Sequence, residues 1–162
     1  MKTNKVLFLT QAAMIAALYV VLTFISNAFG LASGAIQVRI SEALTIFPYF
    51  TPSAVPGLFA GCLISNLLTG AALPDVIFGS IATLLGAVGT RALRKWKWLA
   101  PIAPIVSNTL IVPLILTYVY EIPGGLPYLM LTVGIGEIIS CGIFGLFLLS
   151  VLQKYQAQLF GA

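Results

Sequence analysis

The most informative polar residue of this chain is Glu137, which lies inside an apolar stretch that runs from Leu126 to Leu152. If a helix starts near Tyr128, Glu137 lies roughly 13 Å along it, close to the middle of a ~30 Å apolar layer. A carboxylate at that depth is costly unless it is paired, hydrated or neutralised. Acids inside membranes are functional by default; the alternative is a hydrogen-bonded Glu137 that locks helices together.

Asn108 is predicted to reach a similar depth on the preceding apolar stretch, from Leu99 to Tyr120, when it is counted from the opposite face. The two side chains could therefore converge on one cavity. An amide that only bonds neighbouring helices explains Asn108 as well as a ligand contact does. Carboxylates and amides together suit a planar ligand that is rich in N–H groups.

The remaining candidates lie earlier in the chain. Arg39 and Glu42 are three residues apart, so on a helix they share a face, where they either bind a ligand or neutralise one another. Asn66 falls in the outer half of its apolar stretch. Asp75 follows Pro74, and we expect it to cap the start of the next helix rather than to bind a ligand. With the two residues above, these predict a small polar pocket that opens outward.

A strip of small residues marks the first apolar stretch. It consists of two overlapping Ala-x-x-x-Ala pairs formed by Ala12, Ala13, Ala16 and Ala17. Small residues at this spacing let another helix approach closely, from within the bundle or from another subunit. On the residues alone, packing within the bundle is the favoured interpretation.

The composition indicates a membrane protein. Of 162 residues, 60% are hydrophobic and 7% are charged, and the mean hydropathy is +1.08. Charged residues in soluble domains usually approach ~25%. Because a spanning helix needs about 20 residues, residues 1–162 are predicted to form a single transmembrane substrate-binding domain of five or six crossings. The clustering of the basic residues indicates membrane topology, not nucleic-acid binding.

Charge placement predicts the number of helices. Lys2 and Lys5 precede the first apolar stretch, and residues 91–97 form a basic loop, so the positive-inside rule places both groups in the cytoplasm. An even number of crossings must separate them. The strong apolar stretches between them are residues 6–30, 54–73 and 76–91. The weaker stretch over residues 35–50 must then supply a fourth crossing, so we expect it to span or nearly span despite its polar residues.

Two more crossings complete the prediction. They give an all-α integral membrane protein, a compact bundle of six transmembrane helices with both termini cytoplasmic, with Ser33 outside and Lys95 inside. Cys62 and Cys141 lie in apolar runs and are expected to pack as small hydrophobes, without a disulfide or a metal.

Several functions compete at this point. An intramembrane enzyme is disfavoured because the sequence has no histidine, no close acid pair and no Cys-x-x-Cys, and no cofactor is predicted. A scaffold protein also competes, as does a channel or carrier that works alone. Neither an internal repeat nor a nucleotide-binding glycine loop is evident, so energy for transport would have to come from a partner.

The sequence resembles a known family, the substrate-binding S components of energy-coupling factor (ECF) transporters, and within it the QueT-type group assigned to queuosine precursors. The most specific segments are QVRISEALT at residues 37–45, PGLFAGCLISN at residues 56–66 and DVIFGSIAT at residues 75–83. The first is the strongest, because hydropathy gives no reason for it. The resemblance covers nearly the whole chain.

The resemblance implies an importer subunit in the bacterial plasma membrane that is not an enzyme. Its implied partners are a transmembrane coupling subunit, which would dock on the alanine strip, and two cytoplasmic ATPases. The implied ligand is a 7-deazaguanine such as queuine, with an S component for another vitamin as the alternative. Glu137 or Glu42 would accept the N–H pair of the base, Asn108 or Asn66 would contact the ring carbonyl, and Arg39 or an aromatic ring would cover a face.

Overall fold

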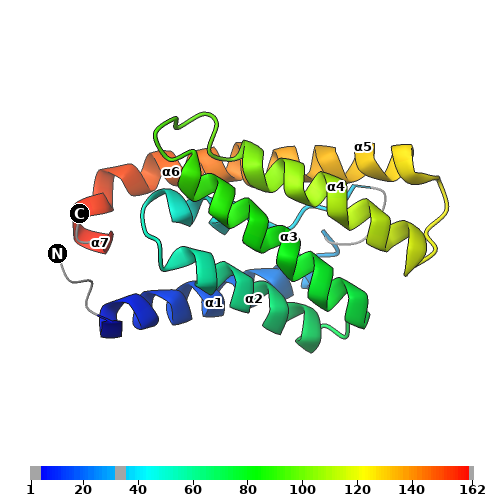
Figure 1. Cartoon of the computed structure of the whole chain (residues 1–162), viewed down its shortest axis with the longest axis horizontal. Helices are drawn as coiled ribbons and strands as arrows, with labels where there is room; N and C mark the ends of the chain where they lie inside the picture. Colours follow the sequence, from blue (N-terminus) through cyan, green and yellow to red (C-terminus); the bar gives the residue numbers. More distant parts are fainter. Residues whose placement is uncertain (1–4, 32–35, 161–162) are drawn as a thin grey trace.

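The chain folds into a bundle of helices, and the computed structural model describes residues 5–31 and 36–160 (Figure 1). In chain order the elements are α1 (Lys5–Ala28), the 3-10 helix η1 (Ile40–Tyr49), α2 (Ala54–Leu68), α3 (Leu73–Ala92), α4 (Ile102–Tyr118), α5 (Leu126–Glu137), the π-helix η2 (Ile138–Phe144), α6 (Gly145–Leu152), the 3-10 turn η3 (Gln153–Tyr155) and α7 (Gln156–Phe160). Elements α5 to α7 follow one another without a loop. The predicted all-α bundle of six helices is therefore confirmed.

Within the described residues, three helices are long and apolar enough to cross a membrane: Lys5–Ala28, Leu73–Ala92 and the continuous run Leu126–Phe160. The apolar helices α2 and α4 are shorter, with 15 and 17 residues. A multi-pass membrane protein follows from these helices. Ser33 and Lys2, whose positions were part of the predicted topology, lie outside the described residues.

The expected fourth crossing over residues 35–50 is not a regular transmembrane helix. Its helical part, η1, has 10 residues, which at ~2.0 Å per residue reach about 20 Å, less than the ~30 Å apolar layer. Every residue from Ser41 to Ile46 is buried in the bundle. This segment is thus a helix inside the protein that carries buried polar side chains and is shielded from lipid by its neighbours.

The first two α-helices touch through small residues. A Cβ added at Gly57 would lie 2.7 Å from the Ala12 carbonyl oxygen, and one at Gly61 would lie 3.0 Å from that of Ala16. The inward half of the alanine strip therefore packs against α2. Ala13 and Ala17 are exposed on the other side of α1, so the four alanines do not form one common surface.

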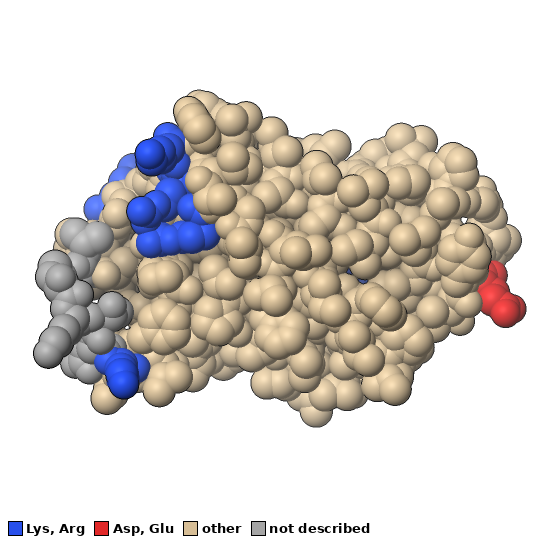
Figure 2. Space-filling model, viewed as in Figure 1, with Lys and Arg blue, Asp and Glu red and all other residues tan. Residues whose placement is uncertain are grey.

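The two ends of the molecule differ in charge. The start of α1, the end of α7 and the loop between α3 and α4 lie at one end (Figure 1). Figure 2 shows basic side chains gathered at that end and a small acidic patch at the opposite end. This arrangement agrees with the parity argument, whereas the side of the membrane that each end faces stays a prediction.

Site-directed labelling tests the orientation. We expect a cysteine in place of Glu121, in the loop after α4, to react with an impermeant thiol reagent from outside the cell, and one in place of Lys95 to react only after the membrane is opened. Both positions are exposed, and the native Cys62 and Cys141 are 2% and 1% exposed, so background labelling is expected to be low. Labelling of both positions from the same side would contradict the six-helix topology.

Candidate functional site

The most deeply buried acid of the described chain is Glu42, which is 1% exposed. The hydroxyl of Tyr19, on α1, donates to its Oε1. The side-chain amide of Asn108, on α4, donates to its Oε2 at 3.3 Å. Both carboxylate oxygens of Glu42 are therefore already used as acceptors by neighbouring helices.

Helix η1 holds Glu42 in place because the other polar groups of this helix are also hydrogen-bonded. Thr45 Oγ1 donates to the Glu42 carbonyl at 2.6 Å, and Thr23, on α1, donates to Ser41 Oγ at 3.0 Å. At its start, the Ile40 N–H donates to Ser26 Oγ at 2.9 Å. A buried polar helix is stable only where its polar groups find such partners.

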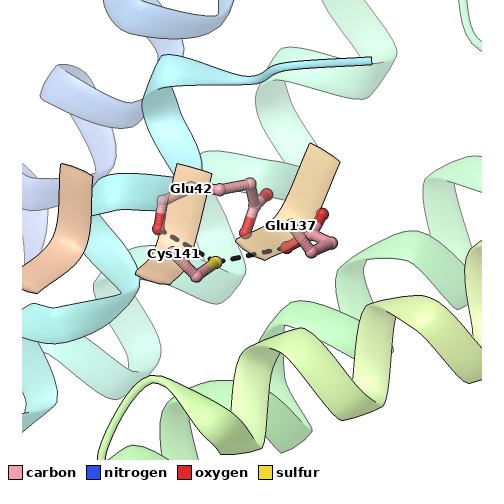
Figure 3. A group of neighbouring side chains, drawn as sticks. All are labelled: Glu42, Glu137 and Cys141. Carbon is pink, nitrogen blue, oxygen red and sulfur yellow. Dashed lines mark hydrogen bonds between the residues drawn. The ribbon is translucent and has the colours of Figure 1, made fainter. Parts of the chain in front are cut away.

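Glu137 lies where α5 passes into the wider turns of η2, and it is 8% exposed. The Cys141 thiol donates to its Oε2 at 3.2 Å, which is the one hydrogen bond of regular geometry to this carboxylate among the described residues. One ligand atom each of Glu42, Glu137 and Cys141 lie within 4.8 Å of one another (Figure 3). The structure thus forms a close acid pair between residues that the sequence separates widely, which corrects the expectation that there is none.

Asn108 and Glu137 do converge on one cavity, together with Arg39 and Glu42. This inner cavity has a volume of about 20 Å³, room for about one water molecule. Thr83 and Gly79, on α3, contribute to its wall. It can take up the edge of a ligand, not a whole ring system.

A larger outer cavity of about 360 Å³ lies next to it, and Gln37 and Arg39 line both. Its other polar lining residues are Thr23, Asn27, Asn66, Thr69, Asp75 and Tyr120. This volume falls in the range of small-molecule sites. These residues line a polar pocket of two adjoining compartments, whereas its opening to the outside and its binding of a ligand stay predictions.

The extended segment before η1 forms the partition between them. The Arg39 N–H donates to Ser140 Oγ, on η2, at 3.2 Å. A Cβ at Gly136 would overlap the Gln37 carbonyl oxygen, so this glycine lets the segment lie directly on α5. Arg39 and Glu42 form no salt bridge among the described residues, because Glu42 bonds Tyr19 and Asn108 instead.

The expected capping role of Asp75 is wrong. Helix α3 begins at Leu73 with Ala72 as its N-cap, and no side chain caps it by a hydrogen bond. Asp75 Oδ2 instead accepts from the Tyr120 hydroxyl at 2.9 Å, and that hydroxyl accepts from the Ala72 N–H at 3.0 Å. Partial burial raises the pKa of Tyr120, and the Asp75 charge raises it further, so the phenol stays a donor at neutral pH.

Sequence reasoning missed Tyr19, Gln37, Tyr120 and Cys141 as residues of this site. Tyr19 and Cys141 lie in apolar runs, where a hydropathy scan treats both as hydrophobes. The one signal that could have found Tyr19 was its depth in its helix, since a buried tyrosine hydroxyl needs a partner.

The Glu42, Glu137 and Cys141 cluster has oxygen and sulfur atoms of the kind that zinc accepts. Two observations argue against a cation there. Both Glu42 oxygens already accept hydrogen bonds, and the Arg39 side chain brings a positive charge to the same cavity. The cluster therefore suits hydrogen bonding better than metal coordination.

Comparisons with known proteins find related sequences. The family model described as QueT transporter matches residues 9–154. A curated protein of Lactococcus lactis subsp. cremoris (strain MG1363), named queuosine precursor transporter QueT, is 36% identical over 85 residues, which are 52% of this chain and 50% of that protein. The match therefore spans about half of the relative's length. No solved structure matches the chain.

Loss of the Tyr19 hydroxyl should lower the stability of the fold directly. Tyr19→Phe leaves one Glu42 oxygen buried without a donor, and we expect it to destabilise the protein by about 1 to 3 kcal/mol. Thermal unfolding of the purified protein in detergent measures this. Tyr118→Phe, at a position that is 75% exposed, is the matched control. Equal melting temperatures for the two variants would contradict the role given to this bond.

Proposed function

Because the chain belongs to the QueT transporter family, we propose that it is the substrate-binding membrane subunit of an ECF importer and captures a queuosine precursor, a 7-deazaguanine, outside the cell. The observation that carries the proposal is the free hydrogen-bonding capacity of Glu137 at the inner cavity. The family and the name of the Lactococcus relative support the ligand class.

Glu137 is the better candidate of the two acids for contact with the base. The edge of a guanine-like ring carries two parallel N–H donors, and one carboxylate can accept both. Tyr19 and Asn108 already occupy the Glu42 oxygens, whereas Glu137 receives the Cys141 thiol, which is a weak donor, and lies beside the Asn108 amide. The role of Glu42 in this proposal is to hold Asn108 beside the ligand.

The size and polarity of the cavities indicate where the ring would lie. The inner cavity admits only the N–H edge, and of the two larger cavities that share lining residues with it, the outer cavity is the more polar, so we place the rest of the base there. Arg39 lines both cavities and can place its guanidinium against the ring face. The Asn108 amide, which lies beside both carboxylates, would donate to the ring carbonyl in place of its contact with Glu137.

Delivery across the membrane requires partners in this proposal. A coupling subunit would dock on α1, where Ala13 and Ala17 are exposed and Ala12 and Ala16 are covered by α2. Two cytoplasmic ATPases would supply the energy, and the complex would reside in the cell membrane. Small exposed residues on an apolar helix allow the close approach that such docking needs.

Ligand binding to the purified protein tests recognition. We expect a 7-deazaguanine, and not a panel of vitamins, to raise the melting temperature of the wild type. Glu137→Gln replaces an acceptor by an amide that itself donates, which should weaken binding by about 1 to 3 kcal/mol or more while stability changes little.

Glu121→Gln is the matched control, because it makes the same chemical change on an exposed loop residue. Normal binding by Glu137→Gln would move the contact to Glu42. Stabilisation by a vitamin alone would replace the proposed ligand. Uptake by the protein alone in liposomes would remove the need for partners.

A pair of tryptophan substitutions tests docking. Ala16→Trp inserts a large ring between α1 and α2, and we expect it to destabilise the isolated protein by about 1 to 3 kcal/mol. Ala13→Trp points away from α2, so the variant should fold and bind ligand but assemble poorly with the coupling subunit. Melting of the lone variants and co-purification with the partner measure the two effects. Intact assembly of Ala13→Trp would exclude this face as the docking surface.

A further inference from the structure

One end of the protein carries positive charge that acidic side chains do not offset. Six basic residues belong to the elements that meet there: Lys5, Arg91, Arg94, Lys95, Lys97 and Lys154 (Figures 1 and 2). The four acids of the chain lie elsewhere, three in the linings of the inner and outer cavities and Glu121 in the loop after α4. A surface with a surplus of one sign attracts partners of the opposite charge. This end therefore favours an anionic partner.

The loop that carries most of these charges, between α3 and α4, has a defined backbone. Thr90 Oγ1 donates to the Ala100 carbonyl at 3.1 Å and so closes the loop at its base, where Ala100 is buried in a hydrophobic cluster. Within the loop, the Trp96 N–H donates to the Leu93 carbonyl at 2.9 Å, and the Leu99 N–H donates to the Trp96 carbonyl at 3.0 Å. The basic side chains are thus held ready for a partner, which does not have to order the loop first.

Two of the basic side chains tie the loop to the rest of the protein. The Lys97 ammonium donates to Gln153 Oε1, on η3, at 3.2 Å. The Arg91 guanidinium, at the end of α3, donates to the Pro48 carbonyl at 3.1 Å. The first of these bonds brings η3 to the loop, and Lys154 is the next residue of η3. The loop and η3 therefore form one basic surface.

The other three cations of this surface are available to a partner. Arg94, Lys95 and Lys154 are exposed, and none of their side chains makes a hydrogen bond or an ion pair with the part of the chain that the structure describes. Arg94 also lies within electrostatic range of Arg91. Like charges at such range repel one another, and an anion bound between them relieves the repulsion.

Exposed aromatic and apolar side chains adjoin these cations. The Trp96 and Trp98 side chains are 57% and 70% exposed, and the Lys97 ammonium lies 5.5 Å from the centre of the Trp98 ring. Directly after the loop, α4 exposes apolar side chains at a spacing of four residues, which places them along one face of the helix: Ile102, Val106, Leu110 and Leu114. The basic surface thus continues into an apolar stripe.

This combination fits a lipid better than another macromolecule. Tryptophan rings at the end of a transmembrane bundle lie at the level of the lipid headgroups, and basic side chains beside them attract anionic headgroups. An acidic protein or a nucleic acid would offer anions too, but neither accounts for indole rings that lead into an apolar stripe on a spanning bundle. A phospholipid matches both parts, with its phosphate at the cations and its acyl chains along α4.

We propose that the basic surface is a binding site for the headgroup of an anionic phospholipid, whose phosphate oxygens contact Arg94, Lys95 and Lys154. The inference is independent of the solute that the protein carries, because it requires only that the bundle spans a membrane. A role limited to orienting the chain during insertion makes a different prediction. In that case the folded, purified protein would not distinguish an anionic lipid from a zwitterionic one.

The experiment measures binding of two short-chain lipids with identical acyl chains, phosphatidylglycerol and phosphatidylcholine, to the purified protein in a neutral detergent. We expect the wild type to bind phosphatidylglycerol on the order of 10- to 100-fold more tightly. Lys95→Gln should lower this preference about 5-fold, and Arg94→Gln combined with Lys95→Gln should remove most of it. Both side chains lack contacts, so the melting temperatures without lipid should equal that of the wild type.

Lys5→Gln is the matched control, because it removes the same charge from the start of α1, apart from the loop (Figure 1), and it should keep the preference. Equal binding of the two lipids by the wild type overturns the proposal without reference to any variant. An equal loss in Lys5→Gln and Lys95→Gln overturns the assignment to the loop. Displacement of the lipid by equimolar inorganic phosphate, or by a glutamate hexapeptide, overturns the lipid as the occupant in favour of a free anion or an acidic protein.

Discussion

The fold depends on keeping the Glu42 carboxylate hydrogen-bonded at a depth where lipid would otherwise surround it. The cost of an unpaired acid inside a membrane protein is several kcal/mol, and here Tyr19 and Asn108 offset it by donating to both oxygens. These donors come from α1 and α4, so η1 must lie between them. A short 3-10 helix is tolerated at this position because the surrounding helices provide hydrogen-bond partners for its polar groups, which lipid could not do.

Close helix contacts make that arrangement sterically feasible. Gly57 and Gly61 bring α2 against the inward alanines of α1, which places Tyr19 over η1. On the opposite side, Gly136 lets the backbone at Gln37 lie on α5. The π-helix η2 then widens the turn after Glu137 and directs Ser140 and Cys141 toward η1. π-Helical turns are rare and occur mostly at functional sites, and this one forms one wall of the candidate site.

Sequence reasoning predicted the features that follow from averages over many residues. Hydropathy and charge parity were enough for the six helices, and the depth of Glu137 in its helix identified it as a site candidate. The predictions that failed concern places where the chain departs locally from a regular helix. The 3-10 segment has no hydropathy signature, and the pairing of Glu42 with Glu137 depends on how two distant irregular helices meet. The cap expected of Asp75 failed because Tyr120, distant in sequence, provides a competing donor.

Helix α1 links the candidate binding site to the proposed docking face. Tyr19 and Ala17 are two residues apart, which is roughly 200° around a helix, so one points to Glu42 while the other is exposed. In the proposed function the ligand contacts Asn108, which shares Glu42 with Tyr19, so ligand binding changes the hydrogen bonding that sets how α1 lies on the bundle. The same movement would shift Ala13 and Ala17, because a helix moves as a rigid element. In the proposed function, a partner docked on α1 can therefore respond to the ligand without touching it, provided that the loaded and empty proteins differ in the position of α1.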